Sequence, residues 1–333
     1  MGALRVEIGE QPPPGWNERV LASTSGSLQF YHSTHWADRL AELLGDVPVY
    51  ASVYGGNEPV VMLLCFEEAA WRRTGSGLRA LAAAVRRLLP PRRTFRWYGE
   101  PLLVGPADAA AYRLLADALS ARLRESRRRL SAGQWPLALE STLPEDWQRR
   151  RWATLKVNLE QPLDVIRAGC RSAARKEVRK AEARGIEVRR VETLAELREY
   201  GDEAVRCAAR YGKTNVSTAD YLSLWRHCRR NGFIFETFTA YHERQFVAGL
   251  SVWGTPQAVA EFGSFQSAYA YQQKLSGPDL LKWRVIDWAK GQGVRVFDLS
   301  GVNPDPQTQK ERDIRRFKEK WGGVLEEYLV VKS

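Results

Sequence analysis

Residues Val296–Gly323 read VFDLSGVNPDPQTQKERDIRRFKEKWGG. The apolar residues at its start predict a strand, the polar and proline-containing stretch after them predicts a loop, and the basic run that follows predicts a helix. Polar side chains at the carboxyl end of a strand are in a common place for a functional site. Asp298 occupies such a position, although Asp-x-Ser-Gly is also a frequent structural turn.

Upstream of this stretch the chain alternates between helical and extended patterns. The periodicity predicts helices beginning near Asp164, at 193–212 and at 278–293. It predicts strands at 153–159, 185–191, 294–301 and 324–331, and three antiparallel strands within 233–265.

The first half of the chain shows a similar alternation. Apolar strands are predicted at 46–55 and 59–68, because a Gly55-Gly56-Asn57 turn separates them. An amphipathic helix at 76–90, a strand at 95–105 and a long helix at 108–130 follow. Helices around a meander in both halves predict a mixed α/β (α+β) fold.

Composition limits the function classes. The 333 residues carry 50 Lys+Arg against 39 Asp+Glu, a net charge of +11. This charge favours a polyanionic partner, with solvated arginines as the alternative. The four cysteines and four histidines do not have metal-ligand spacing, so we expect free thiols and no metal. No apolar run is long enough to span a membrane, and we expect a cytoplasmic protein.

A basic segment follows Asp164. If 164–184 is one helix, four arginines recur every four residues and form one row, with lysines beside it. Because guanidinium groups suit phosphate oxygens, we predict phosphate binding, while a solvated helix with internal ion pairs is the alternative. The candidate residues are Arg167, Arg171, Arg175, Lys176, Arg179 and Lys180.

The entry to the helix at 278–293 is a second candidate for binding phosphate. It follows a Ser276-Gly277-Pro278 sequence, and a helix N-terminus with glycine can hold a phosphate group. Lys274 and Gly277 fit a coenzyme A loop, whereas Asp279 occupies a position where a small neutral residue is expected. The pattern therefore supports coenzyme A only weakly.

The quoted stretch resembles the C-terminal signature of the Fem-type (FemABX) aminoacyltransferases, and the resemblance covers most of the chain. Three further segments are similar to that family: FYHSTHWADRL at 30–40, with His32 where glutamine is usual, WYGEPLLVGP at 97–106 and RSAARKEVRKAEARGIEV at 171–188. ARYGKTNVSTADYL at 209–222 resembles the helix exit that follows.

The resemblance implies two GNAT-like domains, each with a mixed, mostly antiparallel sheet flanked by helices. We expect the first at 1–158, completed by the strand at about 322–333, and the second at 159–321. It also implies that Lys318 is the catalytic cation and that Phe317 helps to position the acceptor. The substrate-binding candidates are Trp36, Arg39, Asp298, Ser300, Gly301 and Arg316, and Lys274 joins the phosphate-binding set.

The implied reaction moves an amino acid from aminoacyl-tRNA to an amine, without a cofactor. The acceptor would be a peptidoglycan precursor or a natural-product amine, and a lipid-linked acceptor would bring the protein, expected to be a monomer, to a membrane surface. Soluble family members hold the diphosphate of a UDP-linked acceptor with two cations. Arg39 is the only counterpart of the first cation in this sequence, and the second cation has no counterpart after Thr214. The alternatives are an acyl-CoA-dependent N-acyltransferase and a non-catalytic RNA-binding module.

Overall fold

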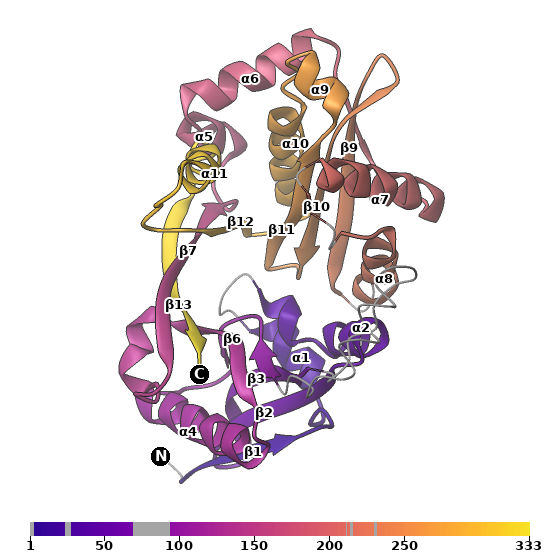
Figure 1. Ribbon diagram of the computed structural model, residues 1–333. Coiled ribbons are helices and arrows are strands. Elements are labelled where there is room, and N and C mark those ends of the chain that lie inside the picture. Colours follow the sequence, from indigo (N-terminus) through magenta and orange to yellow (C-terminus); the bar gives the residue numbers. More distant parts are fainter. Residues whose placement is uncertain (1–2, 24–27, 69–93, 211, 214–215, 230–231) are drawn as a thin grey trace. The chain divides into compact units, whose positions relative to one another are not determined.

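The computed structural model describes residues 3–23, 28–68, 94–210, 212–213, 216–229 and 232–333 (Figure 1). The helix expected at 76–90 lies outside these ranges. The chain divides into two compact units, residues 1–152 with 327–333, and residues 153–326. The division falls within β7 (Gln148–Asn158), a few residues before the expected boundary at the end of that strand.

The first unit contains a multi-stranded sheet and several helices. Its strands are β1 (Leu4–Gly9), β2 (Val47–Gly55), β3 (Glu58–Glu67), β4 (Thr94–Trp97), β5 (Leu102–Leu103), β6 (Arg129–Pro136) and the end of β13 (Val324–Lys332). Its helices are α1 (Trp16–Ala22), α2 (Thr34–Leu44) and α4 (Ala109–Glu125), with 3₁₀ turns at Gln29–His32 and Leu137–Thr142.

The sheet of the first unit has the order β1-β2-β3-β4-β6-β13, and β5 pairs with β3. Neighbours are antiparallel except β4 and β6, which are parallel and are connected through α4. Tyr112, Leu115 and Leu119 of α4 lie in the buried core on one face of this sheet.

The second unit is built from strands β7, β8 (Glu187–Arg190), β9 (Ile234–His242), β10 (Gln245–Gly254), β11 (Ala258–Gln266) and β12 (Val296–Val302). Its helices are α5 (Leu163–Gly169), α6 (Ser172–Ala183), α7 (Leu194–Ala209), α8 (Thr218–Cys228), α9 (Ala268–Gln272), α10 (Gly277–Gly291) and α11 (Gln309–Glu319).

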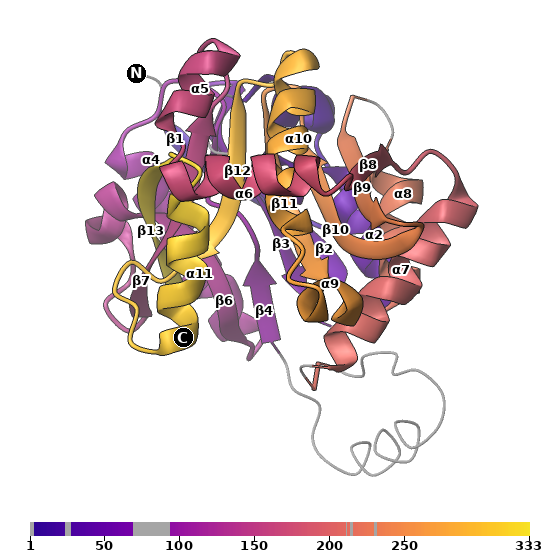
Figure 2. The same ribbon diagram turned by 90° about the horizontal axis from the view of Figure 1, so that it is seen from above.

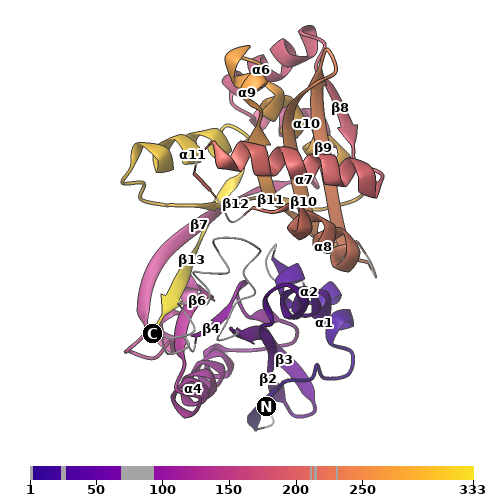
Figure 3. The same cartoon turned by 45° about the vertical axis from the view of Figure 1, so that its right-hand side comes forward.

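The sheet of the second unit has the order β7-β12-β11-β10-β9-β8. Neighbours are antiparallel except β11 and β12, which are parallel and are connected through α10. Helix α10 packs on β9–β11 and against α6 (Figure 2), while α7 contacts β11 and α8 and crosses the strands as Figure 3 shows. The two units therefore share one plan: a meander, a helix, and a strand parallel to the last meander strand.

Close packing at the start of α10 requires a glycine. A Cβ atom on Gly277 would lie 2.2 Å from Cγ1 of Val247, a buried residue of β10. A side chain at this position would push the N-terminus of α10 away from the sheet. The Ser-Gly-Pro entry, read from the sequence as a candidate phosphate loop, thus has a packing role.

Two sequence-based expectations are wrong in detail. The helix expected at 108–130 ends at Glu125, and Arg129–Pro136 forms β6 between β4 and β13. The helix expected at 164–184 is broken after Gly169, since the Arg171 amide donates to the carbonyl of Lys320 at 2.8 Å instead of continuing the helical ladder. A contact from a distant segment decides this break.

Candidate active site

The parallel strands β11 and β12 part after a short pairing. Their register runs from Ala258↔Val296 to Ala260↔Asp298 and ends there, although both strands continue. Opposite β10, Phe262 is an extra residue in β11, which is a β-bulge at the point of parting. Beyond this point the backbone groups of β11 and β12 no longer pair with each other.

Two side chains of β12, Asp298 and Ser300, fix the backbone where β11 and β12 part. The buried Asp298 carboxylate accepts hydrogen bonds from the Thr154 hydroxyl and, at 2.6 Å, from the Ser300 amide. Ser300 has a φ of 65°, the left-handed region that is uncommon outside glycine, and its hydroxyl donates to the Glu261 carbonyl at 2.5 Å. Asp298 and Ser300 therefore fix the backbone between the two strands.

Lys318 lies in the last turn of α11, and its Nζ donates to the Gly301 carbonyl at 3.0 Å. A capping box formed by Thr308 and Glu311 starts this helix. Burial lowers the pKa of Lys318, while the charges of Glu261 and Asp298 act in the opposite direction. An ammonium group thus stands beside the end of β12.

A buried ion pair, Lys282 with Glu261, lies near Lys318. Lys282 of α10 contacts the Glu261 carboxylate, and the side chains are 1% and 9% exposed. Burial would raise the pKa of Glu261, but the charges of Lys282 and Lys318 outweigh it and leave that pKa below its usual value. The ammonium of Lys282 also lies 5.5 Å from the ring centroid of Phe297.

The structure brings together some of the predicted site residues. Asp298, Ser300, Gly301 and Lys318 form one cluster. Phe317 is half-buried, with the Lys320 ammonium 4.0 Å from its ring centroid. Arg316 is exposed and pairs with Asp313 at 3.8 Å, so the contacts of this arginine lie outside the cluster.

The N-terminus of α10 carries carboxylates. Asp279 is buried and pairs with Lys320, and the Glu177 carboxylate accepts a hydrogen bond from the Ser276 hydroxyl. Burial raises the pKa of Asp279, which the Lys320 charge partly offsets. Lys274 nearby is exposed, with a φ of 51°. Internal anions therefore occupy the place where a phosphate would need hydrogen-bond donors and positive charge.

The arginine row is not a single helix face. Arg167 belongs to α5, with its guanidinium 5.5 Å from the ring centroid of Trp283, and Arg171 precedes α6 and pairs with Glu319 at 2.9 Å. Arg175 donates to the carbonyls of residues 167, 168 and 170 at 2.6–3.4 Å and so caps α5. Lys176, Arg179 and Lys180 remain on the exposed side of α6.

Trp36 and Arg39 belong to the first unit, on α2. Trp36 is buried among aromatic rings, with ring centroids 5.1 Å from Tyr31 and 5.3 Å from Tyr98. Arg39 is 5% exposed, and its guanidinium lies 4.8 Å from the Trp36 ring centroid. These contacts give Arg39 a packing role within α2.

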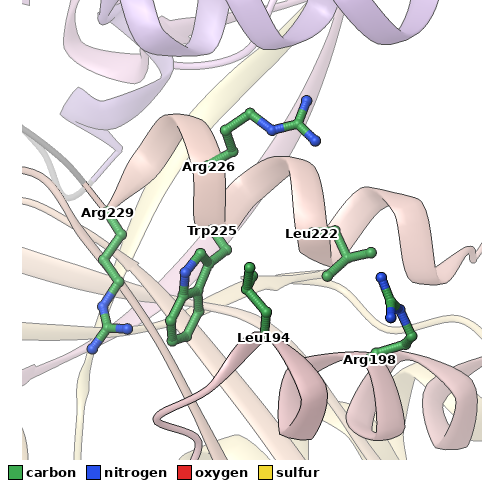
Figure 4. Close-up of a pocket in the computed structure, with 6 residues that line it drawn as sticks. All are labelled: Leu194, Arg198, Leu222, Trp225, Arg226 and Arg229. Carbon is green, nitrogen blue, oxygen red and sulfur yellow. The ribbon is translucent and has the colours of Figure 1, made fainter.

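A separate groove of about 360 Å³ lies between α7 and α8 (Figure 4). It is lined by Leu194, Arg198, Leu222, Trp225, Arg226 and Arg229. Arg229 covers the Trp225 ring at 3.9 Å and pairs with Glu236 at 3.4 Å. None of the six lining residues belongs to the cluster around Lys318.

Comparison with known proteins agrees with the plan of the two units. Residues 168–317 match the family model of the acetyltransferase (GNAT) domain. The crystal structure of FemX is similar with a TM-score of 0.68 and 12% identity, over 97% of this chain and 96% of that one. The fold is a tandem GNAT fold.

Two other solved structures are similar over most of the chain. L-PGS from Bacillus licheniformis is similar with a TM-score of 0.57 and 14% identity, over 98% of this chain and 93% of that one. A tandem GNAT protein from the clavulanic acid biosynthesis pathway is similar with a TM-score of 0.53 and 13% identity, over 99% of this chain and 98% of that one. No curated protein sequence matches.

The expected fold class, a tandem GNAT-like α/β fold similar to the Fem-type enzymes, is therefore confirmed. The match to the acetyltransferase (GNAT) domain model covers residues 168–317, which lie in the second unit. Within the described parts of the chain, no helix is long and apolar enough to cross a membrane, and no group of three or more metal-ligating side chains comes together. The four cysteines are buried, and none of them is in a disulfide.

Sequence reasoning missed Glu261, Lys282 and Thr154. Glu261 follows the apolar run Ala258–Ala260, and Lys282 follows the buried pair Leu280–Leu281 in α10. A charged residue inside an apolar run is a signal for a buried ion pair, since a lone charge there is costly. The partner, however, depends on tertiary structure.

Proposed function

We propose that this tandem GNAT protein transfers an aminoacyl group from aminoacyl-tRNA to an amine. The observation that carries the proposal is the Lys318 ammonium beside the carboxyl end of β12, where β11 and β12 part. The Fem-type sequence signature around Phe317 and Lys318, together with the FemX-like fold, supports the same reaction.

The chemistry is aminolysis of an ester. The acceptor amine attacks the aminoacyl carbonyl, a tetrahedral oxyanion forms, and the C–O bond to the ribose breaks while the amine proton passes to the ribose oxygen. A fixed ammonium stabilises the oxyanion more than the neutral carbonyl. Lys318 would supply that cation, and Asp298 and Ser300 would hold the backbone next to it.

The α10 N-terminus supports a donor other than coenzyme A. A helix start normally attracts phosphate, but Asp279 and Glu177 place negative charge there. The match to an acetyltransferase domain keeps acyl-CoA as the second candidate donor.

The test is to incubate the purified protein with mixed charged tRNAs and, separately, with acetyl-CoA, in the presence of candidate amines. We expect amine-dependent deacylation of a tRNA and no consumption of acetyl-CoA. Consumption of acetyl-CoA alone would replace the proposal by its alternative. Binding of RNA without turnover of either donor would favour the non-catalytic module.

The exposed side of α6 is the proposed tRNA contact. Arg171 and Arg175 have partners within the unit, so Lys176, Arg179 and Lys180 are the better candidates for phosphate contacts, with Arg167 and Lys274 as weaker ones. Lys180 approaches Glu177 at 3.7 Å, which leaves Lys176 and Arg179 for the sharpest test.

Replacing Lys176 and Arg179 by alanine is expected to weaken tRNA binding and flatten its salt dependence. Each lost phosphate contact lowers the log–log slope by roughly 0.7–0.9. The measurement is a binding titration at several salt concentrations. The control is Arg189→Ala/Arg295→Ala, which removes two exposed charges elsewhere on the same unit. An equal slope change in both double variants would assign the effect to net charge alone.

The acceptor is expected not to be a UDP-linked muramyl pentapeptide. Arg39, the counterpart of one diphosphate-holding cation, is buried and stacked on Trp36, so its charge is poorly available. Loss of one charge-assisted phosphate contact removes about 1.5–3 kcal/mol of binding. Calorimetric titration should therefore give no micromolar binding, and micromolar binding with an aminoacylated product would contradict the expectation.

A further inference from the structure

Four ionisable side chains from four elements meet where β11 and β12 part. Glu261 is on β11, Lys282 on α10, Asp298 on β12 and Lys318 on α11. When all are ionised, the two lysines balance the two carboxylates. Glu261, Lys282 and Asp298 are almost completely buried, whereas Lys318 is only partly buried. Lys318 is thus the member of the cluster that a substrate can reach.

Burying this many charges is not needed for a stable core. A buried ion pair seldom stabilises a fold more than apolar side chains of the same volume would. The neighbours of Lys282 on α10, such as Leu281 and Val285, are apolar and fully buried, so an apolar side chain suits this environment. The buried Glu261–Lys282 pair therefore indicates an electrostatic role, and Lys318 is the neighbouring cation on which the pair acts.

Glu261 and Lys282 differ in their contacts, which gives them different effects on Lys318. Lys282, and not Lys318, contacts the Glu261 carboxylate, and the Lys318 ammonium donates a hydrogen bond to the Gly301 carbonyl. A second carboxylate, Asp298, is occupied by the Thr154 hydroxyl and the Ser300 amide. Both carboxylates lie close enough to influence Lys318, yet neither engages its ammonium directly.

We propose that Glu261 and Lys282 are positioning residues for Lys318. The Glu261 carboxylate keeps the Lys318 ammonium charged in its partly buried site. Lys282 occupies that carboxylate, so the Lys318 ammonium stays available to a substrate oxygen and is not held in an ion pair. The inference rests on the proposed role of Lys318 as the cation that stabilises the oxyanion.

The proposal gives opposite expectations for the two members. In Glu261→Gln, the Lys282 charge remains and repels Lys318, so the pKa of Lys318 falls by roughly one pH unit or more. In Lys282→Met, the freed Glu261 carboxylate draws in Lys318, and the pKa of Lys318 rises. In the double variant Glu261→Gln/Lys282→Met, the pKa of Lys318 lies between its values in the two single variants. In Lys282→Arg, the pKa of Lys318 stays near its wild-type value.

The experiment follows the ¹³Cε resonance of Lys318 in lysine-labelled full-length protein through a pH titration, with Lys318→Met to assign the signal. The alkaline limb of the single-turnover pH profile for transfer should move in the same directions. Matched controls are Glu236→Gln, another largely buried glutamate in this sheet, and Lys290→Met, two turns further along α10. Both controls should leave the Lys318 titration unchanged.

The proposal would be overturned if the pKa of Lys318 shifted in the same direction in both single variants, or if it shifted in neither. If Glu261→Gln does not fold, a Lys318 pKa in the double variant that is not below its value in Lys282→Met counts against the proposal. If Lys282→Met does not fold, a Lys318 pKa in the double variant that is not above its value in Glu261→Gln counts against it. A shift of the Lys318 pKa in Lys282→Arg counts against it in either case. The resonance titration needs no donor. Full transfer activity in Lys318→Met would therefore refute the catalytic role while the titration still reports on the cluster.

Discussion

Lys318→Met is expected to slow aminoacyl transfer by on the order of 10²-fold or more, with donor binding and folding nearly intact. Methionine has a similar length but has no charge, so the oxyanion loses its cation while the packing of α11 is largely kept. The loss should appear in the chemical step, because the ammonium interacts more strongly with the oxyanion than with the ground state.

Single-turnover transfer from a charged tRNA measures this step directly. The matched control is Lys310→Met, which makes the same substitution at an exposed position near the start of α11. We expect wild-type transfer rates for the control. Full activity in Lys318→Met under the same conditions would remove Lys318 from the mechanism.

The second large effect concerns the stability of the second unit. Glu261→Gln is expected to lower the free energy of unfolding by about 3–5 kcal/mol, because it leaves the Lys282 ammonium buried and unpaired. Removing both charges in Glu261→Gln/Lys282→Met should cost much less than the sum of the single changes, since no uncompensated charge remains. Urea unfolding followed by tryptophan fluorescence measures the cycle.

The pH dependence of this cycle has a defined sign. The pKa of Glu261 is lowered in the folded state, so ionised Glu261 contributes stability above its ordinary value of 4.5. That contribution is lost as the pH falls through the lower, folded-state pKa. The stability difference between wild type and Glu261→Gln should therefore shrink at acid pH. Additive single-variant effects, or a difference independent of pH, would contradict the buried pair.

Much of the fold follows from local pattern. The runs at 46–55 and 59–68, with a glycine turn between them, pair as β2 and β3, and the three strands expected within 233–265 form β9–β11. Such segments are predictable because antiparallel neighbours are close in sequence and their turns are recognisable. Strand β6 was missed because its partners, β4 and β13, are distant in sequence.

The candidate site divides in the same way. Asp298 was indicated by its place at the end of a predicted strand. Ser300, Gly301 and Lys318 were indicated by the resemblance of the stretch 296–323 to the Fem-type signature. The pairing of Glu261 with Lys282 and the break before Arg171 involve segments that meet only in the folded unit. Burial decides their energetics, and burial is a property of the packed chain.

The sequence by itself determined the type of most elements, the basic character of α6 and α11, and the place of Lys318 in a basic segment that follows the strand containing Asp298. The tertiary structure alone decided which charges are buried, which arginines already have partners, and that carboxylates occupy the start of α10. The physical reason is that helix and strand periodicity are local, whereas the electrostatic environment of a charge depends on every segment packed around it.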